Sequence, residues 1–289
     1  MANVTVTTAD KHIDEMWTPE LNRAVELDIV IAALFDDRSK QLPHGDILHM
    51  PARHNLTAND KSAGSDATPE SITETEQTFT VNTHKIVAQE IEDIVEVQSR
   101  YELRQEFTQA ASYALARVMD VDCGALFDDN STNTVGVLQS ELTDDNLIQA
   151  RKLLKDNAAP MPWHMVVAPG TYSGFLKLDK FVNSLYSGEQ SGRAVHQAQI
   201  GKIYGATAYE SQLTVGTSPN SSGALWSEKH FFKIVQKAPK TDTWFSPLAK
   251  AWIVAADTIY GVFERAEAVE AAAGTTTSRL WGVRLQSVK

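Results

Sequence analysis

The stretch ATPESITETEQTFTVNTHKIV at residues 67–87 predicts a long β-strand that has little of its own to bury. Threonines recur along it, and Phe79 and Val81 fall on one face of a pleated strand. Glu74 and Glu76 stand where a core strand carries apolar residues. We therefore expect this strand to pack against something outside its own fold.

A shorter stretch upstream is the expected partner of this strand. Leu42 to Met50 contains a brief apolar run that ends at Pro51, and a polar segment follows it. The two strands predict a two-stranded arm over residues 44–80, and an isolated two-stranded hairpin is at best marginally stable in water. The arm is either a solvated loop or an extension that lies across a second copy of the chain. The regular β pattern of its return strand favours the second interpretation.

Charged and titratable side chains on the arm are the candidate contacts with a neighbouring copy: Arg53, His54, Lys61, Glu74 and Glu76. The histidines at 44, 49 and 54 also raise the question of a metal cluster. A spacing of five residues aligns side chains neither on one helix face nor on one strand face. We therefore expect a polar arm, with no metal and no cofactor.

Composition indicates a globular protein that is made in the cytosol. The chain has 289 residues, and 43% of them are hydrophobic. It contains no apolar run long enough to span a membrane, and its start lacks the basic and then apolar order that is typical of a secretory signal. Its single cysteine, Cys123, falls in a helical pattern and is expected to be a small buried residue rather than a reactive thiol. The net charge of −11 argues against a groove that wraps tightly around nucleic acid.

Three helices are predicted from apolar spacing. The first covers 20–35 after Thr18 and Pro19, and the third covers Thr143 to Asn157, with Thr143 as its N-cap. The second is the longest, Ser99 to Phe127, roughly 40 Å at 1.5 Å per residue. Its predicted apolar stripe falls at positions 103, 107, 110, 111, 114, 115, 118, 121, 125 and 126. The packing residues expected from it are Leu103, Phe107, Ala114 and Val118.

Strands and helices mix in the middle and final thirds, which indicates an α+β fold. MVVA at 165–168 predicts a buried strand, followed by a Pro-Gly turn and a short helix from 172 to 178. A strand pair is predicted within 200–215. Two further strands, 252–265 and 279–288, are predicted on either side of an AAAGTTTS loop.

Known catalytic signatures are missing from the sequence. It contains no dinucleotide or P-loop glycine pattern, no HExxH and no GxSxG. A hydrolase or small-molecule-binding α/β protein would have to use Asp144, Asp145 or His164 in a closed pocket with convergent polar groups. We expect no enzyme.

The order of these parts resembles the major capsid proteins of tailed bacteriophages, whose fold is named after phage Hong Kong 97. The strings that carry the resemblance are WTPEL at 17–21, GDILHMP at 45–51, IED at 91–93, QS at 98–99, ALARVMD at 114–120, MVVAPGTY at 165–172, IGKIYGATAYES at 200–211 and IYGVFER at 259–265. No single string is specific, and it is their order along nearly the whole chain that resembles the family.

The resemblance implies a division of the chain into named parts of the Hong Kong 97 type fold. Residues 1–43 would be the N-arm, 44–80 the extended loop, and 136–249 the axial domain. Residues 81–135, with the long spine helix, and 250–289 would form the peripheral domain. No cleaved scaffolding segment is expected, because the capsid-like pattern begins by Trp17.

The resemblance also implies a function and partners. The chain would be a structural subunit of the icosahedral shell of a tailed DNA phage, made in the host bacterial cytoplasm and located in the virion. It would assemble with itself as pentamers and hexamers, near packaged double-stranded DNA that it does not read, with no membrane. A separate scaffolding protein and a portal are expected partners, and a decoration protein is a further one. The alternative within the same fold is an encapsulin-like nanocompartment subunit that encloses a cargo enzyme.

Some members of the family cross-link their subunits through a lysine on the extended loop. Lys61 is the only lysine between Gln41 and His84, and nothing in its sequence context activates it. Cross-linking is therefore not expected.

Overall fold

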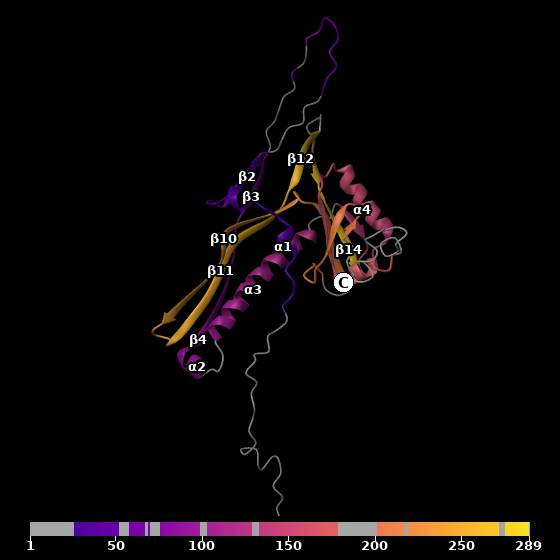
Figure 1. Ribbon diagram of the computed structural model, residues 1–289. Helices are drawn as coiled ribbons and strands as arrows, with labels where there is room; N and C mark the ends of the chain where they lie inside the picture. Colours follow the sequence, from indigo (N-terminus) through magenta and orange to yellow (C-terminus); the bar gives the residue numbers. More distant parts are fainter. Residues whose placement is uncertain are drawn as a thin grey trace, which may run out of the picture.

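The computed structural model describes residues 26–51, 58–66, 69, 76–98, 103–128, 133–178, 201–216, 219–271 and 275–288. A long sheet and a long helix lie side by side in one part of the molecule, and a second sheet with two helices forms the other part (Figure 1). The predicted α+β class is confirmed.

The long sheet has four strands in the order β1-β10-β11-β4. Their bounds are β1 Asp36–Asp37, β10 Phe231–Ser246, β11 Ala251–Glu264 and β4 Thr83–Glu92. The long helix α3, Leu103–Ala125, contacts β11, β4 and β10. Leu115 of α3 packs with Ala111, Ala256 of β11 and Val87 of β4, so one face of this sheet is covered by the helix.

The buried side of α3 agrees with the predicted stripe at Ala111 and Leu115 and differs from it elsewhere. Its most buried apolar positions follow a four-residue step: Ala111, Leu115, Met119 and Cys123, continued by Phe127. The four predicted packing residues, Leu103, Phe107, Ala114 and Val118, are only half-buried. Rows of every fourth residue are inclined to a helix axis, so contact with the sheet follows an oblique line. Val121, predicted to be in the stripe, is 43% exposed for this reason.

The second sheet has six strands in the order β5-β14-β9-β6-β8-β7. Their bounds are β5 Thr134–Gly136, β14 Gly282–Val288, β9 Asn220–Ser227, β6 Trp163–Val167, β8 Ala206–Glu210 and β7 Lys202–Ile203. Helices α4, Asp144–Asp156, and α5, Pro169–Phe175, pack on one face through Leu147, Leu154 and Phe175. Trp163 and Met165 of β6 supply the sheet side of this core.

A central core joins the two parts of the molecule. Val166 and Trp226, on the other face of the six-stranded sheet, pack with Cys123 of α3, Phe231 of β10 and Tyr260 of β11. Cys123 is fully buried, as predicted, and burial raises the pKa of its thiol. Because both sheets and α3 share this core, they form one connected structure.

Several local predictions are confirmed. Helix α4 begins after Thr143, whose Oγ1 accepts a hydrogen bond from the backbone N–H of Asn146 at 3.4 Å. Strand β6 and the pair β7 and β8 lie where the sequence predicts them. The remaining short elements are α2 Asp93–Gln98 and the 3-10 turns Ser39–Gln41 and Leu126–Asp128.

Other predicted elements begin or end at different residues in the structure. Of the helix predicted at 20–35, residues 26–30 are not helical and only Ile31–Leu34 forms α1, while residues 20–25 lie outside the described part. The chain leaves α1 in an extended conformation at Phe35, because Asp36 and Asp37 pair in parallel with Phe232 and Lys233 of β10. Pro169 begins α5 instead of forming a turn, since proline suits the first position of a helix.

Long-range pairing decided what the sequence had not indicated. The sixteen-residue strand β10 was not predicted, and part of the expected AAAGTTTS loop belongs to a hairpin of β12, Ala266–Ala271, and β13, Thr275–Leu280.

The sheets also divide the chain differently from the expected ranges. Strand β10, within the range 136–249, pairs with β11, and β14, within 250–289, pairs with β9.

Candidate inter-subunit interface

The base of the arm is a two-stranded ribbon with one packed and one exposed face. β2, Ile47–Pro51, pairs antiparallel with β3, Glu76–Thr80, and Leu48 lies opposite Phe79. Phe79 is 9% exposed and its ring packs against those of Phe232 and Phe263. The expectation that this strand packs only outside its own fold was therefore wrong at its C-terminal end. The pleat places Phe79 on the long sheet of the same chain.

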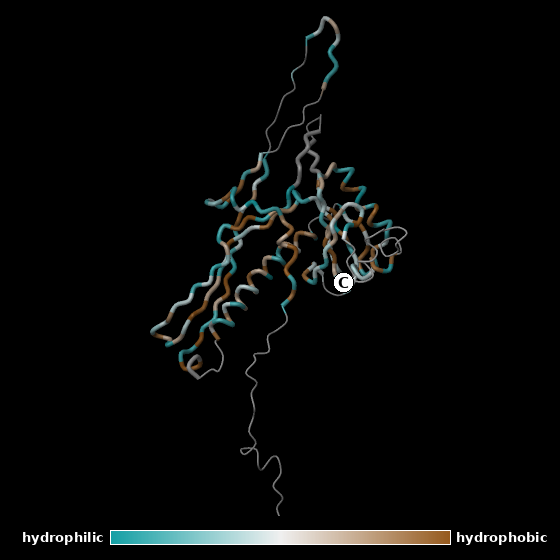
Figure 2. Tube along the Cα trace, viewed as in Figure 1, coloured by the Kyte–Doolittle hydropathy of each residue, from teal (hydrophilic) through white to brown (hydrophobic). Residues whose placement is uncertain are grey.

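The outer part of the arm packs against no described residue. All nine described residues from 58 to 66 are exposed. Their tip is a turn in which the backbone N–H of Ser65 donates to the carbonyl of Ser62 at 3.3 Å, and Gly64 has a φ of +87°. This segment reaches far beyond the sheets (Figure 1), and its residues are mostly hydrophilic (Figure 2).

The structure describes two of the five candidate contact residues on the arm. Lys61 is exposed at the tip, and the carboxylate of Glu76 lies 3.2 Å from Nδ1 of His49 within the ribbon. Both partners of this ion pair are more than half exposed, so its contribution to stability is small. Arg53, His54 and Glu74 lie outside the described residues.

The histidines of the arm do not gather around a common point in the described structure. His44 lies in the loop before β2, His49 pairs with Glu76, and His54 lies outside the described part. Among the residues described, no three His, Cys, Asp or Glu side chains form a group that could hold a metal ion.

The side chains proposed for a hydrolase do not converge. Asp144, at the start of α4, accepts a hydrogen bond from the hydroxyl of Tyr204, and burial raises the pKa of that phenol to about 12. His164 alternates with Trp163 and Met165 along β6 and therefore faces the opposite side of the sheet, near Trp226. Burial lowers the pKa of His164. An acid and a base are not brought together in this part of the chain.

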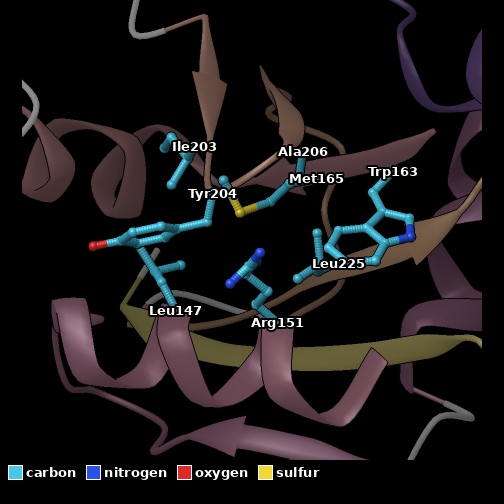
Figure 3. Close-up of a pocket in the computed structure, with 8 residues that line it drawn as sticks. All are labelled: Leu147, Arg151, Trp163, Met165, Ile203, Tyr204, Ala206 and Leu225. Atoms are coloured by element: carbon cyan, nitrogen blue, oxygen red, sulfur yellow. The ribbon is translucent and has the colours of Figure 1, made fainter. Parts of the chain in front are cut away.

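A small pocket lies between α4 and the six-stranded sheet (Figure 3). Its cavity volume is about 10 Å³, room for about one water molecule and far below the 300 to 1,000 Å³ of usual ligand pockets. Its lining is apolar except for Arg151 and Tyr204: Leu147, Arg151, Trp163, Met165, Ile203, Tyr204, Ala206 and Leu225. The pocket lacks the convergent polar groups that the enzyme interpretation requires.

Helix α1 and the segment before it are held on the long helix by hydrogen bonds that the sequence did not indicate. The backbone N–H of Leu27 donates to the Tyr113 hydroxyl at 2.7 Å, and that of Ala32 donates to the Asp120 carboxylate at 2.6 Å. Asp120 is fully buried, and burial raises the pKa of its carboxyl group. Its position three residues before Cys123 and seven before Phe127, on the same apolar face of the helix, was the only sequence signal.

A second exposed region lies at the far end of the long sheet. Leu248, in the turn between β10 and β11, is fully exposed, and Ile94 and Val95 of α2 are 61% and 47% exposed. The backbone N–H of Asp93 donates to the carbonyl of Lys250 at 3.0 Å, so α2 and this turn are joined. Both extremities of the described molecule thus present surface that no described residue covers.

The fold has close counterparts among solved structures, although no family model and no curated protein matches the sequence. A structure from Mycobacterium phage Che8 superimposes with a TM-score of 0.79 at 20% identity, covering 94% of this chain and 96% of that one. The capsid structure of cyanophage P-SCSP1u gives a TM-score of 0.75 at 13% identity, covering 97% and 94%. The mature capsid of bacteriophage PhiM1 gives 0.70 at 14% identity, covering 95% and 92%.

These similarities extend over almost the whole length of both chains. The chain therefore has a fold found in phage capsids. None of the described helices is long and apolar enough to cross a membrane.

Proposed function

We propose that this chain, which shares its fold with phage capsid structures, is the structural subunit of the icosahedral shell of a tailed DNA bacteriophage. One observation carries the proposal beyond the fold: an arm anchored at its base by Phe79 extends through nine exposed residues. A hairpin of this kind is stabilised by a neighbour rather than by its own chain. The role of the chain is structural and not catalytic.

We propose that the parts of a Hong Kong 97 type fold follow the two sheets. We assign the N-arm to residues 1–43 and the extended loop to 44–80. The peripheral domain consists of α3 and the four-stranded sheet, and the axial domain of the six-stranded sheet with α4 and α5. This division follows the sheets and therefore moves β10 to the peripheral part and β14 to the axial part.

Shell assembly does not require that each contact is strong. A subunit that engages several neighbours at once gains avidity, because later contacts form at a high effective concentration. The candidate arm contacts, Arg53, His54, Lys61, Glu74 and Glu76, would supply one such set. The subunits would form pentamers and hexamers in the virion.

The remaining partners follow from the same proposal. A scaffolding protein and a portal would direct assembly, and a decoration protein would bind the finished shell. Packaged double-stranded DNA would lie nearby without sequence-specific contact, since a net charge of −11 disfavours tight binding to phosphates. The protein would be made in the cytoplasm of the bacterial host.

Electron microscopy of the purified protein, with size-exclusion chromatography at low and moderate salt, tests the proposal. Closed polyhedral shells, or rings of five or six subunits, are expected. Shells recovered from infected cells should contain DNA, whereas an encapsulin-like subunit would enclose a protein cargo. A protein that stays monomeric at all concentrations, even with the phage's scaffolding protein present, would overturn the proposal.

A further inference from the structure

Strand β4 forms one margin of the four-stranded sheet (Figure 1), and no described strand pairs with its outer edge. Its ten residues pair with β11 in one unbroken register, from Thr83 opposite Tyr260 to Glu92 opposite Ala251. The edge contains no proline and no bulge. A long and regular open edge is a template for pairing with another strand.

The opposite edge of the same sheet, formed by β1 and β10, is not a long and regular open strand. There β10 is covered at its start by β1, and further along it contains Pro239 and two shifts of register, between Val235 and Lys237 and between Lys237 and Lys240. Proline and bulges are the usual devices that prevent edge pairing. The sheet is therefore protected on one side and open along β4.

The side chains of β4 suit a second strand on the face away from α3. His84, Ile86, Ala88 and Glu90 alternate along this face, and all four are exposed. Ile86 is 63% exposed, the largest value among the described large apolar residues within strands. The face thus has a small apolar centre between a titratable base at one end and a carboxylate at the other.

We propose that β4 pairs antiparallel with β4 of a second copy of this chain, about a twofold axis at Val87. In this register Ile86 lies opposite Ala88 of the partner subunit, and His84 lies opposite Glu90 of the partner subunit. The two sheets would join into one continuous sheet of eight strands, a form of strand addition that takes its affinity from backbone hydrogen bonds. Twofold symmetry forms each contact twice.

Two observations select this register. Directly opposed residues in an antiparallel pair share a face. With both α3 helices on the same side of the joined sheet, the register therefore shifts only in steps that keep His84, Ile86, Ala88 and Glu90 together. The next register in one direction sets Ile86 against the partner's Glu90, and the next in the other direction leaves Glu90 without its basic partner. Only the proposed register gives all four residues a matching partner, apolar opposite apolar and base opposite acid, because each neighbouring register mismatches at least one of them.

The contacts of His84 and Glu90 within their own chain leave room for this pairing. His84 contacts the Asp257 carboxylate at 3.0 Å through Nε2, and its Nδ1 has no hydrogen bond with a described residue. The carboxylate of Glu90 has no hydrogen bond or ion pair with any described residue. The proposed contact gives each of these groups a partner, and the proposal rests on the shell function argued above.

Cysteine cross-linking tests the register. Opposed residues in antiparallel strands have Cα atoms about 4.5 to 5.5 Å apart, within the range of a disulfide. Ile86→Cys and Ala88→Cys subunits are prepared separately, mixed, assembled and oxidised. A disulfide-linked dimer is expected from the mixture and not from either variant alone. The native Cys123 is fully buried and does not interfere.

Matched controls use the same face and the same strand. A mixture of Ile86→Cys with Asp242→Cys, an exposed position on β10, should give no dimer. Glu90→Arg places two like charges together and should abolish the cross-link between Ile86→Cys and Ala88→Cys. Glu92→Arg, equally exposed but beyond the apolar and charged pairs, should leave the cross-link unchanged.

The outcomes separate this proposal from the proposed function. Closed shells in which the mixture yields no dimer would overturn the strand pairing and leave the shell function standing. Failure to assemble under all conditions would overturn both. A dimer that persists with Glu90→Arg would overturn the pairing of His84 with the partner's Glu90.

Discussion

The ring of Phe79 packs nearly perpendicular to that of Phe232, with centroids 4.9 Å apart and an angle of 86° between the planes. Phe79 belongs to the arm, and Phe232 is the second residue of the long strand β10. This contact attaches an otherwise exposed ribbon to the body of the subunit. It divides the arm into a base that belongs to the subunit's core and an outer part that does not.

Replacing Phe79 with alanine should destabilise the isolated subunit by about 3 kcal/mol, the usual cost of removing a buried aromatic ring. Urea unfolding of the soluble subunit measures the change. Thr78→Ala, on the exposed face of the same strand, is the matched control and should shift the free energy of unfolding by less than about 0.5 kcal/mol. Equal effects of the two substitutions would contradict the packing at the base.

Deleting residues 55–70 should leave the subunit folded and unable to close shells. The described residues within this range are all exposed, so the free energy of unfolding should stay the same while assembly is lost. Circular dichroism and urea unfolding check the fold, and electron microscopy checks the particles. Normal particles from the deletion variant would remove the arm from the assembly mechanism.

Leu115→Asp should prevent or severely weaken folding, because Leu115 is 1% exposed between α3 and the long sheet. An uncompensated charge there should cost about 4 kcal/mol or more. Val121→Asp introduces the same side chain into the same helix at a position that is 43% exposed, and should cost about 1 kcal/mol or less. Comparable yields of soluble protein from both variants would show that the helix face is assigned incorrectly.

Asp120→Asn should change how stability depends on pH. Burial raises the pKa of Asp120 above its ordinary 3.8 in the folded state, so the stability linked to its proton is greatest below 3.8 and is lost as pH rises through the raised value. Asparagine is neutral at every pH, so the variant does not lose stability in this way as pH rises. The free energy of unfolding of the variant, measured relative to the wild type, should therefore increase as pH rises from 4 toward 7. A constant difference would contradict the raised pKa.

Gly223→Ala should disrupt the six-stranded sheet. A Cβ at Gly223 would collide with the backbone carbonyl of Val166 on the neighbouring strand, which cannot move aside as a flexible side chain can. We expect a loss of about 3 kcal/mol. At Gly174, in α5, a Cβ would have its nearest contact at 4.0 Å, so Gly174→Ala should be neutral or slightly stabilising in thermal unfolding.

Much of the local structure could be predicted because its signals lie within a few residues. The N-cap at Thr143, the long helix and the buried strand at Trp163–Val167 each depend on short-range hydrogen bonding or apolar spacing. The exposed part of the arm was also predictable from its lack of apolar residues. The candidate contacts on it remain predictions, and three of the five lie outside the described residues.

The open edge of β4 could not be predicted in the same way. Which strand lies at the margin of a sheet depends on pairing between residues such as Thr83 and Tyr260, which are far apart in the chain. Apolar alternation is the same for an edge strand and an inner one. The buried Asp120 was missed for a related reason, since its partner Ala32 comes from a distant segment.

By itself, the sequence determined the mixed α+β class, the long helix and the presence of a polar arm, since each follows from periodicity and composition along one continuous segment. Only the tertiary structure decided that Phe79 packs into the core of its own chain, that β10 and β14 belong to different sheets, and that the buried row of α3 continues from Leu115 through Met119 and Cys123. The physical reason is that strand pairing and core packing are contacts between distant segments. Their free energy depends on which surfaces meet, and a local pattern leaves that choice open.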